Sequence, residues 1–485
     1  MATAPRPNQP ATRIEKDSLG PKEIPAHVYY GVQTARAVEN YPISGMRAHP
    51  TLIRAFGLIK QAAAEANLAL GLVDEKRARA IIQAAKEVAE GKWDAEFVVD
   101  VFQAGAGVSF HMNSNEVIAN RAIEILGGKL GDYSVVHPND HVNYGQSTND
   151  VFPTGMRLGA LLELERLYPV VDSLAAACEA KGREFDAIMK SGRTHLQDAV
   201  PIRLGQEFAA YGVAIRRAEK GSKQAAETLR DLGLGGSAVG TGINTHPQYR
   251  EKAVANLARL SGQKLTPAAD MREAMQSNYC MAAVSSALKN LALEVIRISN
   301  DLRLLASGPN TGLREIDLPT LQPGSSIMPG KINPVMPELA AMVSFQVIGN
   351  DVAVAMAVQA GQLELNVMMP TMSYSVMQSI TILTNMLRAF TEKCVAGLTP
   401  NPDRCNFYAQ STVSLATALN PYIGYAKAAE IVKESIATGR SIIEIAREKK
   451  LLTEDEIQEI LDPKNMTEPQ MPKEATKDRE AKKKL

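Results

Sequence analysis

The residues with the clearest chemical potential lie in one segment, residues 324–334, where two serines, a lysine and an asparagine stand among glycines and prolines. Glycine and proline at this density predict a loop rather than the interior of a helix. Small residues let a loop approach a substrate closely, and Gly324 and Gly330 are candidate hinges for its opening and closing. The segment therefore predicts a loop that can close over a small ligand.

The side chains of this loop suit chemistry on a small carboxylic acid. Lys331 offers a positive charge to a carboxylate, and Asn333 can donate hydrogen bonds. Ser325 and Ser326 can donate or accept protons. The alternative interpretation is an ordinary serine-rich surface turn beside a solvated lysine, because short motifs also occur by chance.

Four further segments extend the pattern along the chain. The first combines residues 13–17 and 29–34, and the other three are residues 113–116, 141–150 and 192–201. Together with residues 324–334, they resemble in composition and order the aspartase/fumarase superfamily. Members of that superfamily eliminate an amine or water from succinyl compounds and leave fumarate. The resemblance covers residues 11 to 470, nearly the whole chain, and five separated blocks in the same order make coincidence negligible.

The elimination requires a base and a set of groups that hold the substrate. Removing a proton next to a carboxylate is difficult, so an enzyme must stabilise the enolate-like carboxylate that forms. The resemblance implies that Ser325 is the catalytic base, and a serine can act so only where its alkoxide is stabilised, for example by backbone N–H groups in a tight loop. It also implies that Thr194, Lys331 and Asn333 hold the α-carboxylate. No cofactor is implied, and the dispersed histidines and cysteines show no metal-ligand spacing.

The resemblance places the remaining predicted site residues around the other end of the substrate. Ser147, Thr148 and Ser326 match the pocket for the second carboxylate, where negative charge builds. Asn149 and His195 match groups near the leaving amine. Ser147 or Thr148 can also simply cap a following helix, and both roles are compatible because a helix N-terminus favours an anion. His195, taken alone, can equally be a core histidine bonded to the backbone.

The segments that flank the site distinguish the two main reactions of the superfamily. Residues 332–338 resemble those of aspartases, as do residues 29–34 and 197–201. These three flanks favour L-aspartate as the substrate and make the chain an ammonia-lyase. The alternative is a class II fumarase, which hydrates fumarate to L-malate with the same base and carboxylate groups.

Three positions depart from the superfamily pattern. Val108 replaces a threonine expected to contact the substrate's amino end, and His111 replaces an asparagine. Valine donates no hydrogen bond, so one bond is lost or replaced by water, or Ser109 or His111 takes over the amine. Met369 stands where aspartases often carry an acidic residue. These departures affect the expected substrate preference rather than the reaction class.

A non-enzymatic interpretation must be weighed as well, because members of the superfamily have been reused as structural proteins. That interpretation predicts the loss of site residues. The chain keeps Ser325, Lys331, Asn333, Thr148 and His195, and this argues for an enzyme.

Composition restricts the partners of the chain. The 485 residues include 53 basic and 53 acidic ones, so no bulk charge attracts nucleic acid or an anionic membrane, and 45% are apolar. The four cysteines are scattered, which predicts free, buried thiols in a reducing compartment. The N-terminal residues lack the apolar core of a signal peptide, so we expect none, and we expect no apolar run of membrane-spanning length. A cytoplasmic enzyme that acts on a small-molecule substrate is expected.

Apolar residues in alternating steps of three and four predict long helices around residues 164–178, 288–305 and 376–394. Alternation typical of strands is scarce, so the fold is expected to be mostly α. We expect an N-terminal domain over residues 1–146, a central long-helix bundle over 147–400 and a small helical domain over 401–485, which ends in a charged, mobile tail from Asn465. The resemblance implies a homotetramer whose bundles associate and whose active sites are shared between chains.

Overall fold

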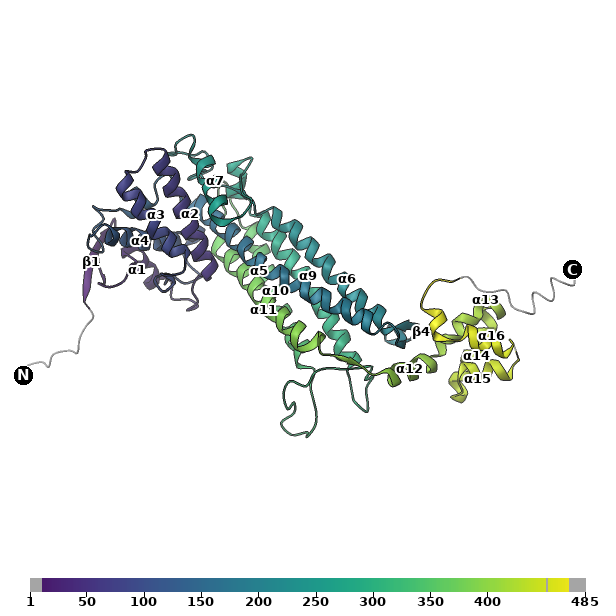
Figure 1. Cartoon of the computed structure of the whole chain (residues 1–485). Helices are drawn as coiled ribbons and strands as arrows, with labels where there is room; N and C mark the ends of the chain where they lie inside the picture. Colours follow the sequence, from purple (N-terminus) through teal and green to yellow (C-terminus); the bar gives the residue numbers. More distant parts are fainter. Residues whose placement is uncertain (1–10, 451, 471–485) are drawn as a thin grey trace, which may run out of the picture. The chain divides into compact units, whose positions relative to one another are not determined.

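The structure is a computed structural model that describes residues 11–450 and 452–470. It is mostly α, as predicted (Figure 1). The helices are α1 (Val32–Asn40), α2 (Pro50–Ala69), α3 (Glu75–Ala89), α4 (Val108–Ile125), α5 (Thr148–Glu184), α6 (Leu204–Glu227), α7 (Tyr249–Ser261), α8 (Met271–Gln276), α9 (Tyr279–Leu305), α10 (Val335–Gln359), α11 (Met369–Phe390), α12 (Pro402–Ser411), α13 (Asn420–Ile423), α14 (Tyr425–Thr438), α15 (Ile442–Glu448) and α16 (Glu454–Ile460).

Strands occur only as short pairs within the described residues. The antiparallel pairs are β1 (Thr12–Asp17) with β2 (Gly20–Pro25), β3 (Met189–Thr194) with β4 (Gln197–Arg203), and β7 (Ile316–Asp317) with β8 (Thr399–Pro400). A fourth pair, β5 (Asp231–Leu232) with β6 (Thr266–Pro267), is parallel. The β3–β4 hairpin carries two of the predicted site residues at its tip.

Contacts divide the chain into two compact units. The first contains the residues up to Pro169, together with Ala218–Leu293 and Val343–Asn385. The second contains Val170–Arg217, Glu294–Met342 and the residues from Met386 onward. The boundaries fall inside the long helices α5, α6, α9, α10 and α11, so each of these helices contributes a segment to both units. The division into three domains stays a prediction.

The three predicted helical stripes are confirmed in α5, α9 and α11. On α9 the positions of the stripe are all buried, and they are Leu288, Leu291, Val295, Ile298, Leu302 and Leu305. Leu293 and Leu304, which lie off this stripe, are 48% and 39% exposed. All four cysteines are buried and free, as predicted from their spacing.

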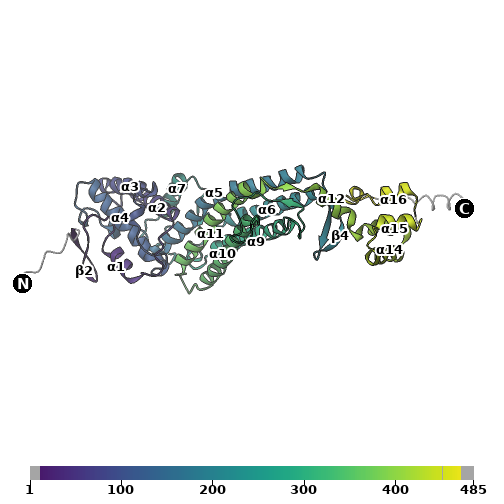
Figure 2. The ribbon, with the colours of Figure 1, turned by 90° about the horizontal axis from the view of Figure 1, so that it is seen from below.

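In the first unit, α2 packs against α3 and α7, and α3 packs against α4 (Figure 2). Three aromatic rings join α2 and α4 to the beginning of α5. The ring centroid of Phe56 lies 4.8 Å from that of Phe110 and 5.7 Å from that of Phe152. A Cβ atom at Gly155 would lie 2.4 Å from the Phe56 ring, so only glycine permits this packing. The aromatic contacts thereby hold the N-terminus of α5 against α2 and α4.

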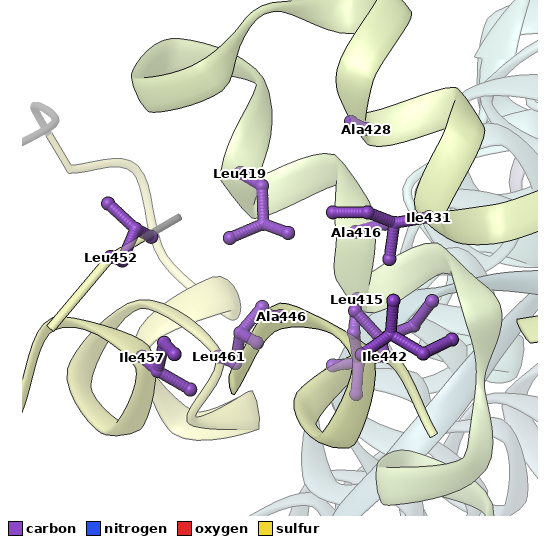
Figure 3. Packing of buried hydrophobic residues seen from close by; sticks show 11 residues of the cluster. Leu415, Ala416, Leu419, Ala428, Ile431, Ile442, Ala446, Leu452, Ile457 and Leu461 are labelled. Carbon is purple, nitrogen blue, oxygen red and sulfur yellow. The ribbon is translucent and has the colours of Figure 1, made fainter. Parts of the chain in front are cut away.

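In the second unit, the C-terminal helices enclose their own apolar cluster (Figure 3). Leu415, Leu419 and Ile431 pack there against residues of α15, which include Ile442, and against residues of α16. Ser441 and Thr453 begin α15 and α16 with capping boxes, which satisfy the first backbone N–H groups of each helix.

The charged tail was predicted to be mobile from Asn465, and its first residues correct that expectation. Arg203 donates to the Thr467 hydroxyl at 2.8 Å and to the Glu468 carboxylate at 2.7 Å, and these bonds tie the segment to β4. The prediction for residues 471–485 lies outside the described residues.

Two helices, α9 and α10, have the length and apolar composition that a membrane crossing requires. We expected no apolar run of membrane-spanning length, and α9 and α10 show that this expectation is wrong. Within the first unit, the two helices are joined by polar contacts, because Asp351 accepts from the Ser285 hydroxyl at 2.8 Å and from the Lys289 ammonium at 2.6 Å.

Candidate active site

Two of the three residues predicted to bind the second carboxylate, Ser147 and Thr148, lie at the N-terminus of α5 in the first unit. The Ser147 hydroxyl accepts from the backbone N–H of Asn149 at 3.2 Å, and the Asp150 carboxylate accepts from the backbone N–H of Ser147 at 2.9 Å. Ser147 therefore caps the helix, as the sequence predicted. The helix dipole at this N-terminus favours an anion beside Thr148.

Asp150 connects this first turn of α5 to the segment 235–237 through hydrogen bonds. Its buried carboxylate also accepts from the backbone N–H groups of Gly235 and Ser237, each at 3.0 Å. Burial raises the pKa of Asp150 to about 6, while the amide bonds and the charge of Lys60 act in the opposite direction. The side chain of Asn149 donates to the carbonyl of Ala238 at 2.8 Å. The segment 235–238 thus holds the pocket residues in place.

His111, one of the three departures, lies directly behind Thr148. Its Nδ1 atom is 2.7 Å from the Thr148 hydroxyl, and its Nε2 atom is 2.7 Å from the Nζ atom of Lys60. Burial, reinforced by the charge of Lys60, lowers the pKa of His111 well below its usual value. Because both ring nitrogens are engaged within the chain, His111 is not available to bind the substrate's amine.

The other two departures differ in exposure. Val108 is 42% exposed at the beginning of α4, where a substrate can reach it. Met369 is fully buried at the beginning of α11, so its side chain belongs to the core.

The loop that carries Ser325 belongs to the second unit. The Ser325 hydroxyl oxygen accepts from the backbone N–H groups of Ile327 at 3.3 Å and Met328 at 3.0 Å. Gly324 and Gly330 have φ values of +80° and +79°, which favour glycine. At Gly324 a Cβ atom would lie 1.9 Å from the carbonyl oxygen of Lys331, so the closed base of the loop requires glycine. The predicted backbone donors around Ser325 are therefore present.

The same loop borders a cavity of about 580 Å³ within the second unit. Lys331 and Asn333 line the cavity together with Arg314, Asp317 and Lys393. The Lys331 ammonium donates to the Asn333 side-chain oxygen at 2.5 Å, so the two groups predicted to hold one carboxylate lie side by side. Three cations against one carboxylate make the lining favourable for an anion. Ser326 is exposed on the loop.

Thr194 and His195 lie at the tip of the β3–β4 hairpin, also in the second unit, and both are exposed. The interpretation of His195 as a core histidine is therefore wrong. His195 and Leu196 have φ values of +56° and +60°, which non-glycine residues rarely adopt. Below the tip, the buried Glu315 pairs with Arg193 at 3.0 Å and with Lys190 at 3.1 Å. Positive φ at both His195 and Leu196 is the geometry of a two-residue hairpin loop, which presents Thr194 and His195 at the tip.

The predicted residues thus form three groups. Ser147, Thr148 and Asn149 are together in the first unit. The hairpin tip and the Ser325 loop lie in the second unit, each with its own contacts. Sequence analysis missed Lys60, which is fully buried. The available signal was its place on an otherwise apolar stretch of α2, four residues after the core residue Phe56.

Comparisons with known proteins identify the family of the chain. A family model described as Lyase matches residues 20–349, and a model described as Fumarase C C-terminus matches residues 415–468. An aspartate ammonia-lyase from a Bacillus species is 49% identical, and the match covers 94% of this chain and 98% of that protein. A class II fumarate hydratase from Halobacterium salinarum is 48% identical over 94% of this chain and 97% of its own.

A solved structure agrees over the same range. The fumarate lyase:delta crystallin from Brucella melitensis is 46% identical, with a TM-score of 0.92, and the match covers 95% of this chain and all of that one. The chain therefore belongs to the lyase family of the aspartase/fumarase superfamily and is a lyase that acts on a small molecule.

Proposed function

We propose that this enzyme reversibly deaminates L-aspartate to fumarate and ammonia, with Ser325 as the base. The observation that carries the proposal is the environment of Ser325, whose oxygen already accepts two backbone N–H groups. The same donors stabilise the alkoxide that proton abstraction requires. Relatives named aspartate ammonia-lyase, which match nearly the whole chain, support the choice of substrate.

In the proposed reaction, the Ser325 alkoxide removes a proton from the β-carbon of aspartate. The electron pair of the C–H bond moves into the adjacent carboxylate, where Ser147, Thr148 and Ser326 donate hydrogen bonds to the added charge. The pair then forms the carbon–carbon double bond as the C–N bond breaks, and ammonia leaves beside Asn149 and His195.

The α-carboxylate of the substrate takes no part in this electron movement. Lys331, Asn333 and Thr194 hold it throughout, and the charge of Lys331 supplies most of the attraction. The products are fumarate and ammonia, and the proton on Ser325 is released to solvent.

The alternative, hydration of fumarate, is supported by the class II fumarate hydratase among the relatives. The reverse reaction separates the two. Purified enzyme is incubated with fumarate, with and without ammonium, and the products are identified by proton NMR. We expect L-aspartate when ammonium is present and no L-malate without it. Formation of L-malate in the absence of ammonium would assign the enzyme to the fumarases.

We further propose that the chain forms a homotetramer through α10. Met342, Phe345, Val352 and Met356 share one face of this helix and are each 58–60% exposed in the single chain. A helix that is apolar on all sides is usually buried, and three further copies can bury this face. We propose that a partner chain covers it rather than a membrane, and that the enzyme is cytoplasmic and binds no nucleic acid.

Light scattering coupled to size-exclusion chromatography tests the assembly. The wild type should have the mass of four chains without detergent, and Phe345→Asp together with Val352→Asp should give smaller species. Ile436→Asp is the matched control, because Ile436 is 70% exposed on α14 and lies outside the proposed interface. An unchanged mass in the double variant would refute an interface on this face.

A further inference from the structure

Lys60 is a fully buried lysine, and its surroundings match the three N–H donors of an ammonium group. Its Nζ atom lies 2.7 Å from His111 Nε2, 2.9 Å from the Asn143 side-chain oxygen and 2.9 Å from the Gln146 side-chain oxygen. A lysine in this position is costly unless each donor finds an acceptor. Two amide oxygens accept from Lys60, and His111 Nε2 is the third acceptor in the tautomer that leaves this nitrogen unprotonated.

The orientation of the two amide side chains is set by bonds on their nitrogen side. The Asn143 amide nitrogen donates to the backbone carbonyl of Gln146 at 3.2 Å, and the Gln146 amide nitrogen donates to the carbonyl of Val142 at 3.1 Å. Both side-chain oxygens are thereby directed at Lys60. Burial lowers the pKa of Lys60 well below its usual value, and the charge of the buried Asp150 carboxylate opposes that shift. The two amide oxygens directed at Nζ favour a charged, donating Lys60.

A donating Lys60 decides which nitrogen of His111 carries a proton. Nε2 must accept from Lys60, so in the neutral ring the proton lies on Nδ1. Nδ1–H then donates to the Thr148 hydroxyl oxygen, 2.7 Å away. A hydroxyl oxygen that accepts this bond keeps its own O–H for another partner.

We propose that Lys60 and His111 are positioning residues that orient the Thr148 hydroxyl, so that it donates to the substrate carboxylate on which negative charge develops. This inference rests on the proposed function, in which Thr148 faces that carboxylate. The hydrogen bonds connect three side chains: Lys60 on α2, His111 on α4 and Thr148, the first residue of α5. The ammonium group of Lys60 lies in the core, and the Thr148 hydroxyl lies at the N-terminus of α5.

The reversed arrangement is the competing one. A neutral Lys60 would accept from Nε2–H of His111, and Nδ1 would then accept from the Thr148 hydroxyl. That arrangement directs the Thr148 proton away from the substrate. The two arrangements differ in the tautomer of a single histidine, which is directly measurable.

Nitrogen NMR of enzyme labelled with 15N-histidine reads the tautomer. His111 is assigned as the signal that is missing from the His111→Asn variant. We expect the His111 ring to be protonated at Nδ1 and unprotonated at Nε2. A protonated Nε2 with an unprotonated Nδ1 would overturn it. This readout requires no substrate, so its result is independent of whether the enzyme prefers aspartate.

Kinetics of two His111 variants test the effect on turnover. Asparagine can accept from Lys60 with its oxygen and donate to Thr148 with its nitrogen, so His111→Asn should keep kcat within a few-fold. Leucine can do neither, and His111→Leu should lower kcat by about tenfold or more with a smaller change in KM, because the charge on the carboxylate develops in the transition state. Equal kcat values for the two variants would contradict the proposal.

Asn120→Leu is the control for the loss of a buried polar side chain on α4. The Asn120 side chain bonds to the backbone of Tyr29 and Gly131 and does not contact Thr148. This variant should lower the melting temperature but leave kcat unchanged. If both leucine variants lower kcat equally, the effect of His111 is structural.

A double-mutant cycle completes the test. In a Thr148→Val background, His111→Leu should cause no further loss of kcat, because no hydroxyl remains to be oriented. Independent, additive losses would show that His111 acts on something other than Thr148. The series is measured on whichever of L-aspartate and L-malate the wild type converts faster. A failure of the proposed substrate therefore changes the assay but not the expected ratios.

Discussion

At the scale of single residues, the hydroxyl oxygen of Ser325 already accepts hydrogen bonds from two backbone N–H groups. Ser325→Ala removes the base and leaves the helices untouched, so we expect kcat to fall by at least about a hundredfold with little change in melting temperature. Steady-state kinetics and thermal unfolding measure both quantities. Retention of most of the activity would require another residue as the base.

Lys331 is expected to act on binding rather than on the chemical step. Lys331→Met removes the charge paired with the α-carboxylate, which is bound equally in the ground state and the transition state. The predicted result is a KM raised by about tenfold or more with a much smaller change in kcat. A fall in kcat at saturating substrate, with KM unchanged, would contradict this role.

Val108 is exposed at the beginning of α4, and its side chain offers no hydrogen bond. A neutral hydrogen bond contributes about 0.5–1.5 kcal/mol, so Val108→Thr should lower KM for L-aspartate by a few-fold to about tenfold and leave kcat nearly unchanged. The contrary outcome is that Val108→Thr raises KM for L-aspartate and that the wild type turns over another amine faster than the variant does. That result would show that the departure marks a different substrate.

At the scale of elements, the Ser325 loop offers a matched pair of glycines. Both have positive φ, but a Cβ atom at Gly324 would lie 1.9 Å from the Lys331 carbonyl oxygen, whereas one at Gly330 meets no atom of the described chain within 4 Å. Gly324→Ala should therefore lower kcat/KM by about tenfold or more, because a displaced base loses its alignment. Gly330→Ala should cost clearly less. Equal losses would mean that backbone strain, rather than the close contact, decides the loop's shape.

The elements were predictable where the signal is local. The apolar stripe of α9 and the capping residue Ser147 of α5 depend on neighbours within one helix, and both predictions are confirmed. The pairing of Lys60 with His111 joins residues 51 positions apart, and no local pattern encodes such a contact. The positive φ values of His195 and Leu196 are those of a two-residue hairpin loop. The ion pair of Arg193 with Glu315, by contrast, joins residues 122 positions apart and is equally non-local.

At the scale of the whole molecule, the resemblance implies that each active site combines segments from several chains. Thr148→Val and Ser325→Ala place their lesions in different units of the chain. Co-expression of the two impaired variants, each with its own affinity tag, gives hybrids that two-step purification isolates. We expect these hybrids to regain a measurable fraction of wild-type activity, because some sites receive intact segments from both partners. Hybrids no more active than the two parent variants would place each site within one chain.

Superfamily membership and a mostly α fold were predictable because five blocks and three helical stripes extend over nearly the whole chain. Substrate choice was less accessible. Val108 and His111 depart from the pattern, and only the structure shows that one is exposed while the other is bonded within the core.

The comparison of L-aspartate with L-malate tests the central claim most directly. Purified wild-type enzyme is assayed with each substrate under identical conditions, and the ultraviolet absorbance of fumarate reports both reactions. We predict that kcat/KM for L-aspartate exceeds that for L-malate by at least about a hundredfold, a difference of about 2.7 kcal/mol in transition-state stabilisation. A faster release of fumarate from L-malate would contradict the assignment.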